Sequence, residues 1–203
     1  MKVNGYSIHS ATKTGRDQGD PDVPPLDVWD APDGSCHAEA HDLSTGLPAC
    51  MAVCDLLYAE PPWRRGWDLF HAKAKVVPRQ SWGAFMTQVG DALATDGRPA
   101  ILLCGREGFK YLPVTTPHAL SLYGNEGYAL LFGGATLPTG REQSTFDLLA
   151  ELADRYACIG DPCCGYGVAG RMFRAKGKRS VLTDVNPHCI GVIASEYAQW
   201  THP

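Results

Sequence analysis

The chain has 203 residues, a formal net charge of −4 and 44% hydrophobic side chains. This length fits one domain with a sizeable core, and the negative charge gives no general attraction to nucleic acid, so any such contact needs a local basic patch. Apolar runs are too short to span a membrane or to form a signal peptide, which predicts a cytoplasmic protein.

The eight cysteines are spread along the chain without any C-x-x-C pair. Most lie in apolar, strand-like runs, where cysteine behaves as a small buried hydrophobe. Zinc sites normally show paired ligand spacing, and the alternating Cys-His-Ala-Glu-Ala-His of residues 36–41 is typical of a strand. The sequence therefore predicts reduced thiols and no metal site.

The N-terminal part is polar and rich in Gly, Pro and Asp. Its prolines at 21, 24 and 25 exclude a helix or a central strand there. We therefore expect residues 1–34 to form an extended arm, anchored by Leu26, Val28 and Trp29, ahead of a single domain over residues 35–203. A short strand is predicted at 35–42, ending in Asp42.

An apolar strand at 52–59 leads into the sequence Glu60-Pro61-Pro62-Trp63. Two prolines fix the backbone and remove two N–H donors where the strand leaves the sheet. This places an acid and an aromatic ring at the carboxyl end of a strand, where open α/β sheets bind ligands.

Basic and aromatic residues alternate over residues 63–79. We interpret the basic ones as contacts to nucleic-acid phosphates, and the alternative is a solvated loop with ordinary surface charges. The basic residues are Arg64, Arg65, Lys73, Lys75 and Arg79.

The middle of the chain provides core elements. Residues 81–95 have apolar positions at helical spacing after Ser81, a good N-cap. Strands are predicted at 99–105 and 128–134, with an irregular region at 106–125 that is too short for a recognition domain. A helix at 144–156 begins with a capping arrangement of Ser144 and Asp147, and a final helix is expected at about 188–200.

The strongest pattern is the strand at 157–161, a turn containing Gly165 and Gly167, a helix, and a strand at 180–184 that ends in Asp184. The glycines let the backbone approach a nucleotide-like ligand, and the acid on the next strand is placed to bind its ribose. A dinucleotide oxidoreductase would fit this turn equally well, but it leaves the acid-Pro-Pro-Trp sequence unexplained.

Together these motifs resemble those of S-adenosylmethionine-dependent amino-methyltransferases, which methylate exocyclic amines of DNA bases. Residues 60–63 resemble the catalytic acid-Pro-Pro-aromatic motif, residues 161–167 the loop that holds the methionine end of the donor, and residues 181–187 the ribose-acid motif. The catalytic motif comes first, which is the circularly permuted order of the beta class. The resemblance covers roughly residues 36–200.

The resemblance implies an α/β fold, a doubly wound, mostly parallel sheet of the seven-stranded type with helices on both faces, and S-adenosylmethionine as cofactor. It makes the Glu60 carboxylate and the Pro61 carbonyl acceptors for the amine, with Pro62 and Trp63 completing the catalytic motif. The implied donor-binding residues are Asp161, Cys163, Gly165, Gly167, Asp184, Asn186, Asp42, Thr145 and Phe146.

One position departs from the family pattern, which usually has Asp, Asn or Ser where this chain has Glu60. The first hypothesis is methylation of adenine N6 in DNA. The alternatives are N4-cytosine, a modified base or RNA as substrate, or a nucleic-acid-binding partner with weakened or lost catalysis. The sequence leaves open whether a second copy or a partner subunit takes part.

Overall fold

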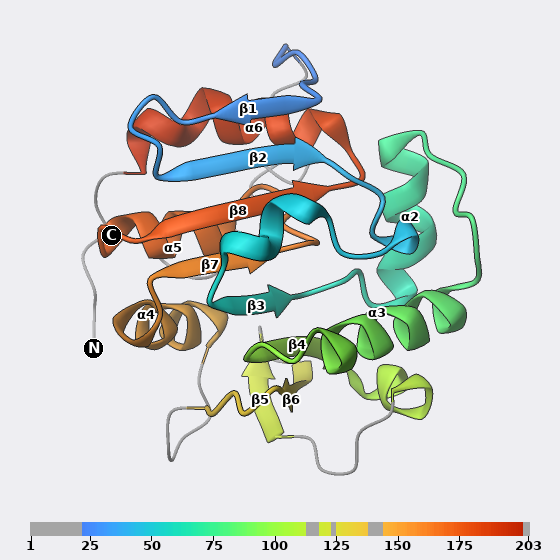
Figure 1. Ribbon diagram of the computed structural model, residues 1–203. Helices are drawn as coiled ribbons and strands as arrows, with labels where there is room; N and C mark the ends of the chain where they lie inside the picture. Colours follow the sequence, from blue (N-terminus) through green and yellow to red (C-terminus); the bar gives the residue numbers. More distant parts are fainter. Residues whose placement is uncertain (1–21, 113–117, 123–124, 138–143, 201–203) are drawn as a thin grey trace.

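The computed structural model describes residues 22–112, 118–122, 125–137 and 144–200 (Figure 1). The first 21 residues of the expected arm lie outside the described residues. Within the described part, the strands form one eight-stranded sheet in the order β1-β2-β8-β7-β3-β4-β6-β5. The strands are β1 (Val28–Asp30), β2 (Cys36–Ala40), β3 (Leu56–Ala59), β4 (Ala100–Gly105), β5 (His118–Leu122), β6 (Asn125–Phe132), β7 (Cys158–Asp161) and β8 (Arg179–Asp184).

The centre of the sheet is parallel, because β2, β8, β7, β3 and β4 pair side by side in the same direction. β6 runs antiparallel to β4 and β5, and β1 runs antiparallel to β2. The predicted doubly wound, mostly parallel sheet is therefore confirmed. The strand that follows β8 in space is β2, from the N-terminal part of the chain, as the permuted motif order requires.

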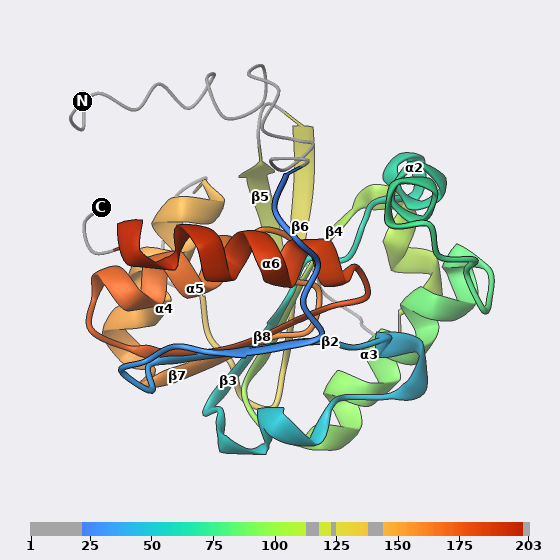
Figure 2. The same ribbon diagram turned by 90° about the horizontal axis from the view of Figure 1, so that it is seen from above.

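Helices cover both faces (Figure 2). Three helices, α4 (Thr145–Arg155), α5 (Val168–Ala175) and α6 (Pro187–Glu196), pack on one face, and α3 (Trp82–Asp96) packs on the other with the 3-10 helices η2 (Leu43–Thr45) and η3 (Ala49–Val53). Helix α2 (Arg64–Ala74) lies at the edge where the parallel strands end (Figure 1). In the described part of the chain, no helix combines the length and apolar character needed to cross a bilayer.

Local signals explain where the helices begin. The Ser144 hydroxyl accepts a hydrogen bond from the Asp147 N–H, and the Asp147 carboxylate accepts from the Ser144 N–H, which completes the predicted capping box of α4. The Ser81 side chain accepts from Ala84 N and starts α3, as predicted. Asn186 caps α6 in the same way through His188 N.

Three predicted elements differ from the structure. Residues 49–53, partly assigned to the catalytic strand, form η3 instead, which buries Met51 completely, and β3 starts only at Leu56. The region 106–125, expected to be irregular, contains the 3-10 helix η4 (Arg106–Tyr111) and β5, which pairs with β6. The last helix ends at Glu196 and continues as the 3-10 helix η5 (Tyr197–Gln199).

The end of the expected arm joins the domain. Residues 28–30 form the edge strand β1, and the Trp29 ring meets Tyr197 edge to face with centroids 4.9 Å apart. Leu26 N donates to the Pro187 carbonyl at 3.0 Å, and the carbonyl of Pro24 lies against Gly191 in α6. This part of the chain therefore covers α6 and extends the sheet by one strand.

Gly167 shows why the turn after β7 needs glycine. Its φ is 79°, in the left-handed region, and a Cβ there would stand 2.6 Å from the Trp200 ring. Replacing Gly167 by alanine is expected to lower the free energy of unfolding by about 2–4 kcal/mol, from backbone strain plus displacement of Trp200. Urea denaturation measures the loss.

Gly177 is the matched control, since its φ is 67° but no atom of the described residues lies within 4 Å of where its Cβ would stand. Gly177→Ala should cost only the backbone term, about 1–2 kcal/mol. Equal losses in the two variants would contradict a packing role for Gly167.

Candidate functional site

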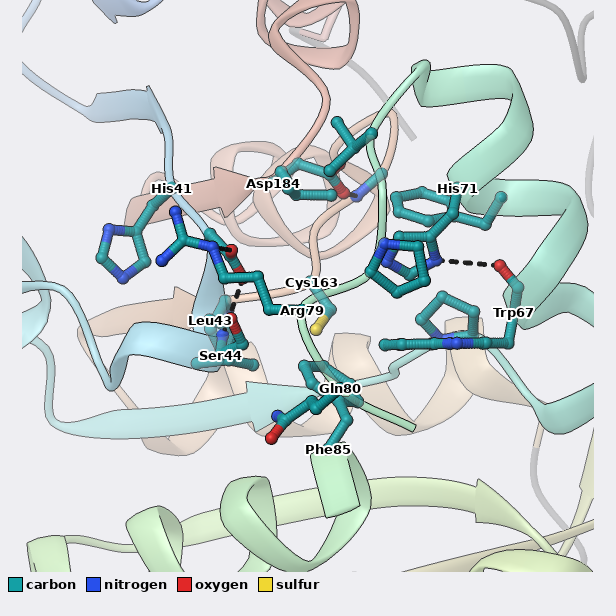
Figure 3. A pocket seen from close by; sticks show the side chains of 18 of the residues that line it. His41, Leu43, Ser44, Trp67, His71, Arg79, Gln80, Phe85, Cys163 and Asp184 are labelled. Carbon is teal, nitrogen blue, oxygen red and sulfur yellow. Dashed lines mark hydrogen bonds and ion pairs between the residues drawn. The ribbon is translucent and has the colours of Figure 1, made fainter. Parts of the chain in front are cut away.

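A cavity of about 270 Å³ lies at the carboxyl ends of β2, β3, β7 and β8. Four segments that follow these strands line it, with residues of α2, α3 and the connection between them. Figure 3 shows His41, Leu43 and Ser44 on one side, Trp67 and His71 on the other, and Asp184 with Cys163 between them. The cavity is thus at the position where open parallel sheets bind ligands.

Asp184 joins the end of β8 to the glycine turn. Its carboxylate accepts hydrogen bonds from Gly165 N and from Asn186 N, both at 2.9 Å. Burial raises the pKa of Asp184 to about 6, against the effect of these two bonds. The predicted ribose acid and the predicted donor turn are therefore held together by direct contact.

Asp161 lies at the end of β7 and is almost fully buried. One of its oxygens accepts from Cys163 N at 3.0 Å. Burial raises the pKa of Asp161 well above its ordinary value, and the nearby carboxyls of Glu60 and Asp184 raise it further. Three acidic groups therefore converge on a poorly solvated site, which favours a positively charged ligand.

Glu60 follows β3 and lines the cavity. The Tyr58 hydroxyl donates to its carboxylate at 3.0 Å, and burial raises the pKa of Glu60 despite this bond. The Trp82 indole N–H donates to the Pro62 carbonyl at 3.0 Å, which fixes the two-proline turn on α3. Pro61 is buried beside the cavity lining.

Trp63 does not occur among the described residues that line the cavity. It precedes α2, and a Cβ on Gly105 would stand 3.1 Å from its ring, so the indole packs over β4. The ring also contacts the core beneath α4, on the opposite side of the sheet from Phe85.

Several predicted donor residues in the described part of the chain do not line the cavity, among them Asp161. Gly167 caps α5, and Asn186 caps α6. Thr145 and Phe146 form the first turn of α4. The Thr145 hydroxyl is buried and has no hydrogen-bond partner within the described ranges. The structure therefore brings together Glu60, Pro62, Asp42, Cys163, Gly165 and Asp184 in the cavity lining.

The connection from α2 to α3 covers the cavity and was not expected from the sequence. Its residues Val76 to Gln80 all line the cavity, and Figure 3 shows this segment passing in front of Asp184. The Arg79 guanidinium lies 2.9 Å from the Asp42 carboxylate across the opening. Gln80 donates to Gln88, which donates to the Ser44 carbonyl at 2.6 Å. At the other end of the segment, Val76 N donates to the His71 carbonyl at 3.1 Å.

The predicted basic cluster is therefore divided. Arg79 pairs with Asp42 in the cavity wall, whereas Arg64 and Lys75 are exposed at the two ends of α2. The side chains of Arg65 and Lys73 lie outside the described residues.

Helix α2 contributes cavity residues that the sequence analysis missed: Trp67, Phe70 and His71. The His71 ring packs against Trp67 in a tilted arrangement with centroids 4.0 Å apart, and its Nδ1 donates to the Trp67 carbonyl at 2.9 Å. The spacing of Trp67, Phe70 and His71, three and four residues apart, could have identified one helical face.

The comparisons with known proteins identify the fold. No protein-family model and no curated protein sequence match the chain. Among solved structures, M1.HpyAVI is similar with a TM-score of 0.50 and 8% identity, over 80% of this chain and 98% of that chain. TTHA0409 of Thermus thermophilus, described as a DNA modification methylase, gives a TM-score of 0.47 and 12% identity, over 74% and 88% of the two chains.

At these identities the similarity concerns the fold alone. The chain therefore has a Rossmann-like α/β fold, similar to that of M1.HpyAVI.

Proposed function

We propose that the protein transfers a methyl group from S-adenosylmethionine to the exocyclic amine of a nucleic-acid base, with N6 of adenine in DNA as the substrate. The observation that carries the proposal is that Glu60 shares one cavity with the glycine turn and Asp184. The solved neighbour M1.HpyAVI has also been determined in complex with S-adenosylmethionine, which supports the choice of cofactor.

The side chains in and beside the cavity fit this cofactor. S-adenosylmethionine carries a cationic sulfonium and an ammonium group. Burial raises the pKa values of Glu60, Asp161 and Asp184, and a bound cation would favour the ionised forms of these carboxyls. Asp161 and the backbone of Gly165 and Gly167 would hold the methionine end. Asp184 would accept hydrogen bonds from the ribose hydroxyls, and Asp42 lies on the adenine side. Bound there, the cofactor supplies an activated methyl group.

The protein's task is to prepare a weak nucleophile. The lone pair of an exocyclic amine is delocalised into the ring, so the amine must be held by acceptors for its hydrogens. The Glu60 carboxylate and the Pro61 carbonyl take this role, and they turn the lone pair toward the donor side of the cavity. Much of the rate then comes from positioning, because the donor already has a good leaving group.

The identity of the base follows from the catalytic motif. An acid followed by Pro-Pro and an aromatic residue resembles the adenine enzymes of the family, whereas serine is commoner where cytosine N4 is methylated. Trp63, three residues after Glu60, would offer a ring face on which an extruded base stacks. The exposed Arg64 and Lys75 at the ends of α2 are available to nucleic-acid phosphates.

Methyl transfer from labelled S-adenosylmethionine to unmethylated DNA, followed by nucleoside mass spectrometry, tests the proposal. We expect N6-methyladenine from the wild type and at least about a 100-fold lower rate in Glu60→Ala, because the amine loses its charged acceptor. Glu60→Asp, which restores the family's usual residue, should remain active.

Donor binding, measured by calorimetry in all three proteins, is the control for these variants. Product from Glu60→Asp but not from the wild type would contradict activity of the natural chain and identify a donor-binding relative. Absence of product from all three, with donor binding intact, would contradict DNA adenine as the substrate.

The raised pKa of Glu60 predicts the pH dependence. Glu60 is a charged acceptor for the amine hydrogens only when ionised, so activity is lost as pH falls through its folded-state pKa, which burial raises above the ordinary value of 4.5. Tyr58→Phe removes a hydrogen bond that favours the carboxylate, and should move the acidic limb of kcat/KM to still higher pH. Tyr156→Phe, at the end of α4, is the matched control and should leave the limb in place. An unchanged limb in Tyr58→Phe would refute this role for the hydroxyl.

A further inference from the structure

A second cluster of reactive side chains lies away from the donor cavity. His37 and Glu39 belong to β2 and Cys50 belongs to η3, and one ligand atom from each lies within 4.8 Å of the others. Cys36 and Ala38 alternate with them and pack against the core under α6. The side chains of His37 and Glu39 therefore point to the opposite face of the sheet, where η3 lies.

Two separations in this cluster are close to those between neighbouring ligands of a tetrahedral metal ion. His37 Nε2 lies 3.3 Å from one oxygen of Glu39, and Cys50 Sγ lies 3.3 Å from the other. Metal bonds of the lengths typical of zinc, at tetrahedral angles, separate neighbouring ligand atoms by about 3.3–3.6 Å. The three donor atoms can thus converge on one ion with small side-chain movements.

Asp30 provides an independent sign of a metal site. It sits opposite His37 in the β1–β2 register, and its carboxylate lies 2.8 Å from His37 Nδ1. The Asp30 carboxylate can only accept a hydrogen bond, so His37 Nδ1 carries the proton between them. The other ring nitrogen, Nε2, lies toward Glu39 and Cys50. This carboxylate–histidine arrangement is the usual support of a metal-binding imidazole.

We propose that His37 Nε2, the Glu39 carboxylate and Cys50 Sγ bind a divalent transition metal of the zinc type, with Asp30 orienting the imidazole. The mixed nitrogen, oxygen and sulfur donors favour zinc over magnesium or calcium, which prefer oxygen alone. Three protein ligands leave the fourth position to water or a small ligand. Binding displaces the thiol proton of Cys50 and the proton between His37 and Glu39.

The metal would fix the connection between β2 and β3. That connection carries His41, Asp42, Leu43 and Ser44, which form one wall of the donor cavity, and η3 leads into the strand before Glu60. A cross-link from β2 to Cys50 would therefore stabilise this wall. The metal site does not depend on the proposed methyl transfer, and its test needs no donor and no DNA.

Titration of the metal-free, reduced protein with Co²⁺ tests the site. We expect one equivalent to give the visible bands of tetrahedral cobalt and a thiolate-to-cobalt charge-transfer band in the near ultraviolet, both removed by Zn²⁺. Zn²⁺ at about one hundred times its Kd should raise the melting temperature by about 5–10 °C, reversibly with a chelator.

Four variants define the ligands. Cys50→Ser should abolish the charge-transfer band, and Glu39→Gln should weaken binding strongly. Asp30→Asn, at an exposed carboxylate whose loss leaves the core intact, should keep the band but weaken the metal affinity by about 10–100-fold. Cys163→Ser, at a half-buried thiol of the donor cavity, is the matched control and should behave as the wild type.

Two results would overturn the proposal. The first is the absence of a charge-transfer band in the wild type. The second is a band or a Zn²⁺-induced rise in melting temperature that persists in Cys50→Ser and Glu39→Gln, because the metal would then be bound elsewhere.

Discussion

The parallel pairing of β3 with β7 and of β7 with β8 is the constraint on which the site depends. Leu56 pairs with Ile159, and Gly160 pairs with Val181, so the three strands end at the same edge. The absence of a side chain at Gly160 permits this packing, because a Cβ there would stand 2.9 Å from Leu57. Glu60, Asp161 and Asp184 consequently reach one region although they are far apart in the chain.

This convergence has an energetic cost. Burial raises the pKa of the carboxyl groups of Glu60, Asp161 and Asp184. The negative charges of Glu60 and Asp184 raise the pKa of Asp161 further. Backbone N–H groups of Cys163, Gly165 and Asn186 offset part of this cost by donating to Asp161 and Asp184. A cationic ligand would offset more of it by favouring the ionised carboxylates.

Glu60 and Trp63 have different surroundings. Glu60 lines the cavity that α2 and the connection to α3 cover, and Arg79 pairs with Asp42 in the cavity wall. Trp63 does not occur among the described residues that line the cavity, and it packs over Gly105 and the core beneath α4. The short segment 60–63 therefore contacts both the cavity and the core on the α4 side of the sheet.

The sequence by itself determined the fold class, the permuted order of the motifs, the helix caps at Ser81 and Ser144, and the glycine turn before α5. These features depend on local chemistry, such as proline at a strand end, hydroxyl caps and glycine at positive φ. Only the tertiary structure decided that residues 49–53 form a 3-10 helix, because a short apolar run has the same sequence pattern in a strand and in a helix. The 3-10 conformation is stabilised by Arg98, which donates to the carbonyls of Met51 and Cys54.

The tertiary structure alone also decided the contacts between distant segments: Arg79 with Asp42, Trp63 over Gly105, and Cys50 beside His37 and Glu39. The two sides of each contact belong to different elements, and a contact between them requires no particular spacing along the chain. No periodicity or motif therefore predicts these contacts, because they form only when the parallel strands bring the segments together.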